Sequence, residues 1–483
     1  MTVPAPAPAT PGRPGRSATL DRALDRACGA RPVPGNRVRY LTDTDVFDAM
    51  RALLRDAAAV VHFENYIIRD DATGREFAGL LADAAGRGVT VRVLYDAFGC
   101  RWTGRAYWDR LRRSGVEVRA LGVRLLHPLR SLRRNHRKYV GVDGRIALVG
   151  GFCIGDEWVG DPAHHRLPWR DTAVEICGPA AAALDLTFER LWARLGPTLS
   201  PPDRAVRVEA CGPAAARVVD GLPGRMRIYR AVELLAASAA SRLWISDAYL
   251  VAPAPMFAAL MAAARDGVDV RVLVPGTTDV PAVRAFTRVG YRELLAAGAR
   301  IWEWRGPMFH AKTVIADDRW VKVGSSNLNV PSLLANYELD LLLDDPPLAT
   351  EAVAQFRRDL SHAMEVTLRP RRVPAGIAKR LPPAVAPTGP VTRHPAHTPS
   401  AAEVSVRAAI TLRHVAEGAR RSIAGAVVFT SVGLGALFVA APRVMGTLVA
   451  LASFWVAAQA TAAFFARRRH GDEPASTPPP DGA

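Results

Sequence analysis

Phe77–Leu94 reads FAGLLADAAGRGVTVRVL, and Phe257–Leu273 reads FAALMAAARDGVDVRVL. Each stretch has the pattern of an amphipathic helix, a glycine that ends the helix, and an apolar strand. The two stretches begin 180 residues apart, and a repeat of that length is too long for a solenoid. We therefore expect an α/β fold in which residues 37–200 and 201–367 form two similar halves related by a pseudo-twofold axis.

Composition narrows the class of protein without choosing one. The chain has 483 residues, of which 49% are hydrophobic and 23% charged, so it can bury the cores of two or three domains. Its net charge of +17 favours anionic partners such as nucleic acid, phosphorylated substrates or an anionic membrane. The five cysteines form no CxxC pair, which argues against a disulfide framework and against a structural zinc site.

The segments outside the two halves differ from them in composition. Residues 1–36 are expected to be a disordered Pro/Ala-rich tail and a segment that leads into the first half. Residues 368–421 combine many prolines with an excess of basic residues, which is typical of a linker and juxtamembrane segment.

Two charge-free apolar stretches, Ile423–Ala441 and Val444–Ala466, follow the linker. As helices they would be roughly 28–34 Å long, which matches a hydrocarbon core of about 30 Å. We expect a transmembrane helical hairpin over residues 422–466, although a buried hairpin of a soluble domain is the alternative. Arginines flank both ends, so the positive-inside rule predicts a multi-pass protein of the inner (cytoplasmic) membrane. The tail 467–483 and the α/β body would then face the cytoplasm.

Each half contains the motif H-x-K-x4-D. Its residues are His136, Lys138 and Asp143 in the first half, and His310, Lys312 and Asp317 in the second. Composition predicts roughly 0.006 such matches by chance in the whole chain. Only four of the 63 basic residues are lysines, and two of those four occupy corresponding motif positions. This indicates a requirement for a compact ammonium charge rather than a planar guanidinium.

The motif residues favour chemistry at phosphorus. On a strand, residues i and i+2 project from one face, so each His and its Lys should point into one site. Two histidines suit a two-step displacement, in which one forms a phosphohistidine and the other transfers protons. The lysines, with Ser326 and Asn327, would hold the anionic oxygens, and no metal or cofactor is needed. For Asp143 and Asp317, two interpretations stay open: a turn or supporting role, and direct chemistry.

The longer strings around these motifs resemble the phospholipase D superfamily and, within it, bacterial cardiolipin synthases. The strings are NHRKYVGVDGRIALVGGFCIGDEW from residue 135, WRDTAVEICGP from 169 and FHAKTVIADDRWVKVGSSNLNVPSLLANYELD from 309. The resemblance covers about residues 38–366 and implies metal-independent phosphatidyl transfer through a histidine intermediate. It implies that His136 is the nucleophile and His310 the acid/base, and that Asp171 in WRD and Glu338 in NYE orient the histidines.

Two features depart from the family pattern. Cys153 in GGFCIG stands where the family often has asparagine, so the first half would lack one phosphate-binding amide. The apolar hairpin follows the α/β body, whereas the synthases of the family commonly carry their membrane segments before it. These departures leave open which phospholipids are donor and acceptor.

The leading hypothesis is a membrane-bound, cardiolipin synthase-like phosphatidyltransferase that joins two phosphatidylglycerols and releases glycerol. A hydrolytic phospholipase D is the close alternative, because water can replace the alcohol in the second step. A nuclease or other phosphodiesterase would suit the net charge, but the apolar spans argue against nucleic acid as the partner. A catalytically inactive lipid-binding scaffold is the remaining alternative, and two intact motifs argue against it. Because the two halves supply both motifs, a monomer can be complete.

Overall fold

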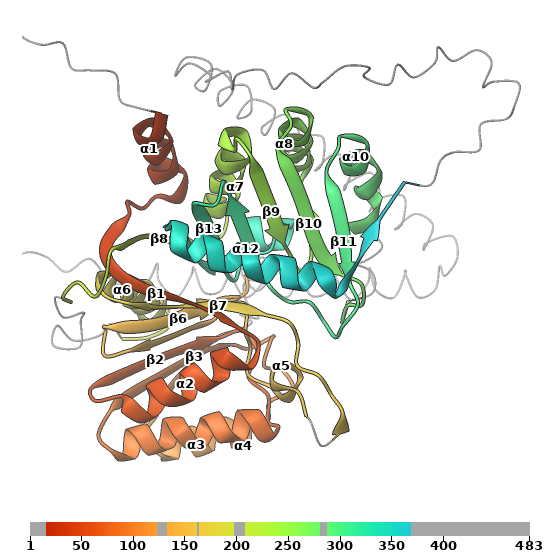
Figure 1. The fold of residues 1–483 in the computed structure, drawn as a ribbon. Helices are drawn as coiled ribbons and strands as arrows, with labels where there is room; N and C mark the ends of the chain where they lie inside the picture. The colour runs from red at the N-terminus through yellow and green to blue at the C-terminus, as the bar shows by residue number, and fades with distance from the viewer. Residues whose placement is uncertain (1–15, 123–132, 162–163, 198–207, 281–286, 369–483) are drawn as a thin grey trace, which may run out of the picture.

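The computed structural model describes residues 16–122, 133–161, 164–197, 208–280 and 287–368, which form a mixed α/β structure around a 15-stranded sheet (Figure 1). The chain begins with α1 (Arg16–Cys28). The first half contains β1 (Val33–Thr42), α2 (Thr44–Asp56), β2 (Val60–Asn65), α3 (Ala72–Gly86), β3 (Thr90–Asp96), α4 (Arg105–Arg113), β4 (Glu117–Leu121), β5 (Tyr139–Val142), β6 (Ile146–Gly150), α5 (Asp156–Val159), β7 (Thr172–Cys177) and α6 (Pro179–Ala193).

The second half repeats this order of elements. It contains β8 (Ala214–Gly221), α7 (Arg227–Ser238), β9 (Arg242–Ser246), α8 (Ala254–Arg265), β10 (Asp269–Pro275), α10 (Tyr291–Ala296), β11 (Arg300–Trp304), β12 (Thr313–Ala316), β13 (Trp320–Gly324), α11 (Val330–Leu334), β14 (Glu338–Asp344), α12 (Pro346–Ser361) and β15 (Ala363–Val366).

The strand order shows the internal repeat directly. The first half has the order β1-β7-β6-β5-β2-β3-β4, and the second has β8-β14-β13-β12-β9-β10-β11, with β15 added at the outer edge. In each half the last three of these strands run parallel and the other neighbours run antiparallel. The halves meet where β1 pairs antiparallel with β8, as a twofold relation between them requires.

Helices cover both faces of the sheet in each half, and α6 and α12 lie between the halves. Figure 1 shows α2, α3 and α4 on the outer side of the first half, and α7, α8 and α10 on the outer side of the second. A hydrophobic core lies between α6 and α12 and joins apolar side chains of both halves, including Trp192 and Phe356. This shared core fixes one half against the other and so fixes the line along which they meet.

Helix α1 lies within the region expected to be a tail and a leading segment. Leu24 and Cys28 are buried in the same core as α7, and the Arg217 guanidinium on β8 bonds Asp21 and Asp25 at 2.8 and 2.9 Å. Leu24 and Cys28 lie four residues apart and therefore share one helix face. The Pro/Ala-rich composition of the first residues led us to expect no helix in this region.

The predicted membrane hairpin over residues 422–466 lies outside the described residues, as do residues 369–421 of the linker and the tail 467–483. Among the helices given above, none is both long and apolar enough to cross a membrane. All five cysteines are free thiols, and the sulfurs of Cys177 and Cys211 lie 2.7 Å apart.

Candidate active site

The two H-x-K segments lie just before β5 and β12, and each is held by the opposite half. The backbone N–H of His136 donates to the carbonyl of Tyr337 at 2.9 Å, and that of His310 donates to the carbonyl of Arg170 at 2.7 Å. Tyr337 directly precedes Glu338 in the second half, and Arg170 directly precedes Asp171 in the first. Each motif is therefore placed beside a carboxylate that its own half does not supply.

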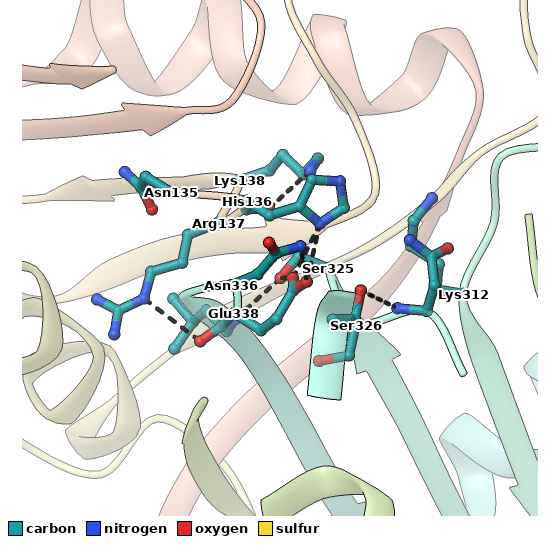
Figure 2. Close-up of polar contacts among 12 residues, drawn as sticks. Asn135, His136, Arg137, Lys138, Lys312, Ser325, Ser326, Asn336 and Glu338 are labelled. Carbon is teal, nitrogen blue, oxygen red and sulfur yellow. Dashed lines mark hydrogen bonds and ion pairs between the residues drawn. The ribbon is translucent and has the colours of Figure 1, made fainter. Parts of the chain in front are cut away.

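The histidine–carboxylate pairs cross between the halves. His136 Nδ1 lies 2.9 Å from Glu338 Oε2, and His310 Nδ1 lies 2.7 Å from Asp171 Oδ2. All four side chains are buried. Figure 2 shows the imidazole of His136 directly above Glu338, with Lys312 on the other side of the site. Each motif histidine therefore takes its carboxylate partner from the opposite half.

Glu338 is held on several sides. Besides His136, its carboxylate accepts hydrogen bonds from Ser325 Oγ at 2.5 Å and Asn336 Nδ2 at 3.1 Å. Burial disfavours the ionised form, but the charges of His136 and Lys138 and the Ser325 bond outweigh burial and lower the pKa of Glu338 to about 2. Glu338 is therefore an anion that fixes the orientation of His136.

Both imidazoles are poised to be neutral. Burial lowers the pKa of His136 below its ordinary value; Glu338 opposes that shift, and Lys138 and Lys312 add to it. Burial and then Lys312 lower the pKa of His310, against the attraction of Asp171. A neutral imidazole that donates its Nδ1 proton to a carboxylate keeps a lone pair on Nε2. That lone pair is what a nucleophile or a general base needs.

The motif lysines are buried next to their histidines. Lys138 Nζ donates to the carbonyl of His136 at 2.6 Å, and Lys312 Nζ donates to the carbonyl of His310. Burial lowers the pKa of both lysines, that of Lys312 to about 8. The charge of Lys312 also lowers the pKa of His136, and the charge of Lys138 lowers the pKa of His310. The two motifs therefore lie close enough to share one site.

The contacts of the motif aspartates favour the turn or supporting role over direct chemistry. Asp143 accepts the backbone N–H groups of residues 58–60 at 2.7–3.0 Å, and Asp317 accepts those of residues 240–242 at 2.8–3.0 Å. Both have a positive φ, of 55° and 51°, in the turn at the far end of the motif strand. The strand between His and Asp thus carries the carboxylate away from the histidine, where it fixes the start of β2 or β9.

Ser326 also differs from its expected role, because its hydroxyl donates to Asp340 rather than pointing to a free phosphate position. Asn327 is buried, and its Oδ1 has no hydrogen-bond partner among the residues that the structure describes. Cys153 is buried at the position that corresponds to Asn327 in the first half, three residues after the final glycine of β6. The two halves therefore present different side chains to the site.

Lys322 is a third buried lysine that the sequence argument did not use. Its Nζ lies 2.9 Å from Asp340 Oδ1 and donates to the carbonyls of Lys312 at 3.3 Å and Ser326 at 2.8 Å. The strand register gives Leu148 as its counterpart in the first half. Lysine is so scarce in the sequence that Lys322 could have been recognised as a candidate, since three of the four lysines lie at this site.

Two buried arginines reinforce the junction. Arg137, between the first His and Lys, pairs with Asp220 on β8 and donates to the carbonyl of Glu338 at 3.3 Å. Arg170, beside Asp171, pairs with Asp359 on α12 through bonds of 2.8 and 2.9 Å. Each arginine joins a site segment of the first half to an acid of the second, so the site is held by ion pairs as well as by the shared core.

Aromatic rings surround the histidines. Tyr66 meets His136 edge-on with ring centroids 4.9 Å apart, and Trp158 and Trp169 both lie 5.7 Å from His310. Tyr249, the repeat counterpart of Tyr66, lies 6.1 Å from His310. No group of three or more His, Cys, Asp or Glu within the described ranges could hold a metal ion.

The comparisons with known proteins agree with this architecture. The family model described as the cardiolipin synthase, PLD-like domain matches residues 50–162 and 233–360, one match in each half. Cardiolipin synthase A of Pseudomonas aeruginosa is 34% identical over 358 residues, covering 73% of this chain and 72% of that protein. Cardiolipin synthase of Halalkalibacterium halodurans is 31% identical over 351 residues, covering 70% of each.

A solved structure shares the fold. The phosphatidylserine synthase of Haemophilus influenzae superimposes with a TM-score of 0.55 at 14% identity, covering 75% of this chain and 96% of that one. Duplicated phospholipase D-like halves with a pair of H-x-K segments define the class of protein. Within that class, the chain belongs to the cardiolipin synthase family, and it is an enzyme of the phosphatidyltransferase type.

The role of the motif aspartates can be tested by comparing Asp317→Ala with His310→Ala. Removing Asp317 leaves backbone donors without their acceptor, and we expect a loss of about 1–3 kcal/mol in the free energy of unfolding. Because Asp317 lies away from the histidines, the folded Asp317→Ala variant should keep its transferase turnover, whereas the folded His310→Ala variant should lose it. Urea unfolding and turnover below the midpoint check both. A folded Asp317→Ala protein as inactive as His310→Ala would show that Asp317 takes part directly in the reaction.

Proposed function

We propose that this protein is a cardiolipin synthase-like phosphatidyltransferase that joins two phosphatidylglycerols and releases glycerol through a phosphohistidine intermediate. The crossed pairs carry the proposal: each histidine has Nδ1 committed to a carboxylate, which leaves Nε2 of both available in one site. One nitrogen can attack phosphorus while the other exchanges protons. The curated relatives named above are cardiolipin synthases, which supports this choice of substrate and product.

In the first step, His136 Nε2 attacks the phosphorus of one phosphatidylglycerol. A P–N bond forms and the P–O bond to the headgroup glycerol breaks. His310, which takes up a proton on Nε2 from solvent when the anionic substrate binds, gives that proton to the departing oxygen. The negative phosphodiester raises the proton affinity of His310 and so offsets the effect of burial. Lys138 and Lys312, both buried, stabilise the charge that builds on the non-bridging oxygens.

In the second step, the headgroup hydroxyl of another phosphatidylglycerol gives its proton to His310 and attacks the phosphorus. The P–N bond breaks, cardiolipin leaves, and both histidines return to their starting states. Water in place of this alcohol would give phosphatidic acid, which is the hydrolytic alternative. The aromatic rings around both histidines favour transfer, because they restrict the access of water and suit a lipid alcohol.

We expect the purified protein to convert phosphatidylglycerol vesicles to cardiolipin and glycerol in the presence of EDTA. His136→Ala should form neither product nor phosphatidyl-enzyme, with turnover reduced by about 10³-fold or more. His310→Ala should lose turnover to a similar extent. Mass spectrometry of the lipids and of acid-quenched protein follows both species. Phosphatidic acid as the sole product would establish hydrolysis instead, and a phosphatidyl adduct on His310 would reverse the two histidine roles.

The shifted pKa values predict the pH profile of kcat/KM. A histidine pKa held below 6.5 keeps His136 neutral, and therefore nucleophilic, at pH 6.5. Lys312, with a pKa of about 8, loses its charge above that pH, so activity should decline on the alkaline side. Lys312→Arg keeps its charge, and its alkaline decline should move upward by a unit or more even if its rate is lower. An unchanged alkaline limb in Lys312→Arg would assign the decline to another group.

We also propose that residues 422–466 form a membrane hairpin with the α/β body on the cytoplasmic side. The support is the charge pattern: two apolar stretches of 19 and 23 residues with arginines at both outer ends. The protein should then stay in the membrane fraction after extraction with alkaline carbonate, whereas a chain that ends at residue 421 should be released. Release of the full chain would leave the buried-hairpin alternative.

A further inference from the structure

Exposed apolar side chains are concentrated at one edge of the structure. Ten large apolar residues are exposed among those described, and seven of them lie in the connections at the strand ends that carry the active site, two of these seven in the short helix α11. These seven are Phe98, Trp102, Leu167, Val280, Val289, Val330 and Leu334. Scattered exposed apolar residues need no explanation, but a concentration around one site marks an interaction surface.

The sheet topology explains why these loops share an edge. β5 begins beside the active site and runs antiparallel to β2 and β6, so the ends of β2, β3 and β6 and the start of β7 lie at the same edge. The same relations hold for β9, β10, β12, β13 and β14 in the second half. The connecting residues 97–104, 151–161, 164–171, 276–280, 287–290 and 325–337 therefore lie at the same end of the strands as the site.

The loop after β3 carries the most exposed member of this group. Trp102 is 73% exposed and Phe98 is 42% exposed. The Arg101 guanidinium lies 4.6 Å from the ring centroid of Phe98 and 5.2 Å from that of Trp102, and Arg134 lies 4.4 Å over Phe98. We call Phe98, Arg101, Trp102 and Arg134 the aromatic–arginine patch.

The patch is held rigidly in its exposed position. Asp96 Oδ1 accepts the N–H groups of Phe98 and Gly99, both at 2.9 Å. At the other end of the loop, the Thr103 N–H donates to the Cys100 carbonyl at 2.9 Å, and its hydroxyl donates to the Ile68 carbonyl. Two large rings kept in water on a well-bonded loop are a preformed contact surface, because no ordering is required when a partner binds.

The same loop is in contact with the catalytic machinery. Gly99 packs so tightly on the Tyr66 carbonyl that a Cβ atom there would lie 2.0 Å from it. The Tyr66 ring in turn meets His136. Asp96 Oδ2 also accepts the N–H of Asn135, the residue before His136, at 2.7 Å. The patch therefore lies at the rim of the site on the side of the proposed nucleophile.

We propose that the aromatic–arginine patch docks this edge of the enzyme onto an anionic phospholipid bilayer, with Trp102 and Phe98 in the interface and the arginines at the headgroups. Tryptophan is enriched at the interface between the apolar core of a membrane and water, and basic residues are attracted to an anionic leaflet. Docking in this orientation would present a phosphatidylglycerol headgroup to His136. The proposal rests on the proposed function for its choice of lipid.

The first test needs no turnover and uses the full chain. Vesicles of phosphatidylglycerol with brominated acyl chains quench tryptophans that enter the bilayer, and Trp102→Phe removes only the ring in question. We expect the wild type to lose a larger part of its fluorescence than Trp102→Phe does. Equal fractional quenching would overturn the proposal, because Trp102 would then remain in water, as it would if it bound a protein or stacked on nucleic acid.

The second test separates docking from chemistry. With Phe98→Ser/Trp102→Ser, we expect kcat/KM on phosphatidylglycerol vesicles to fall about tenfold or more, because two rings no longer leave water. On short-chain phosphatidylglycerol below its critical micelle concentration, kcat/KM should stay within about twofold of the wild type. Leu186→Ala, an exposed leucine on α6 away from the site edge, is the matched control. A parallel fall on both substrates would overturn docking.

The outcomes distinguish this proposal from the proposed function. Wild-type protein that makes no cardiolipin from either substrate refutes the function, whereas the quenching difference at Trp102 still decides whether the patch enters a bilayer. Conversely, cardiolipin production with equal quenching and equal vesicle kinetics in the variants keeps the function and refutes the patch.

Discussion

The hydrogen bond between each catalytic histidine and a carboxylate of the opposite half is the constraint on which the rest of the structure depends. It requires that two chain segments about 200 residues apart in the first pair, and about 140 in the second, stay within hydrogen-bond distance. The β1–β8 pairing, the core between α6 and α12 and the buried Arg137 and Arg170 ion pairs all serve this requirement. Loss of one partner of such a buried pair typically costs about 3–5 kcal/mol.

The halves have the same topology but not the same site chemistry. The second half adds Lys322, Asp340 and Ser325, which fix the turn after β13 and support Glu338. The corresponding positions of the first half are Leu148, Ala173 and Gly151. Unequal surroundings are what a reaction with one nucleophile and one proton carrier needs, because two identical histidines would have no physical reason to take different roles.

Much of the fold and half of the site could be predicted from the sequence. Helix–glycine–strand patterns are local, so the repeat and its α/β class were visible, and the scarcity of lysine singled out Lys138 and Lys312. The role of the aspartates stayed open because spacing along a strand does not say at which end of that strand a side chain acts. Ser326 was chosen over Ser325 because side chains alternate along extended chain, so a shift of one residue reverses which serine faces the site.

The crossing of the pairs was beyond the sequence argument for a different reason. Asp171 and Glu338 could be matched to the family's motifs, but which histidine each one contacts depends on how two halves pack. No local propensity carries that information. The same holds for α1, whose buried face is recognisable only once α7 is there to receive it.

The crossed arrangement bears on how such a chain could arise and change. Each half pairs its histidine with a carboxylate of the other half, so one copy could form these pairs only as two identical molecules. Fusing two copies into one chain removes the concentration dependence of that assembly. It also frees each copy to mutate separately. The lysine, serine and acid found only in the second half are a divergence that a symmetric pair of identical molecules could not accumulate on one side alone.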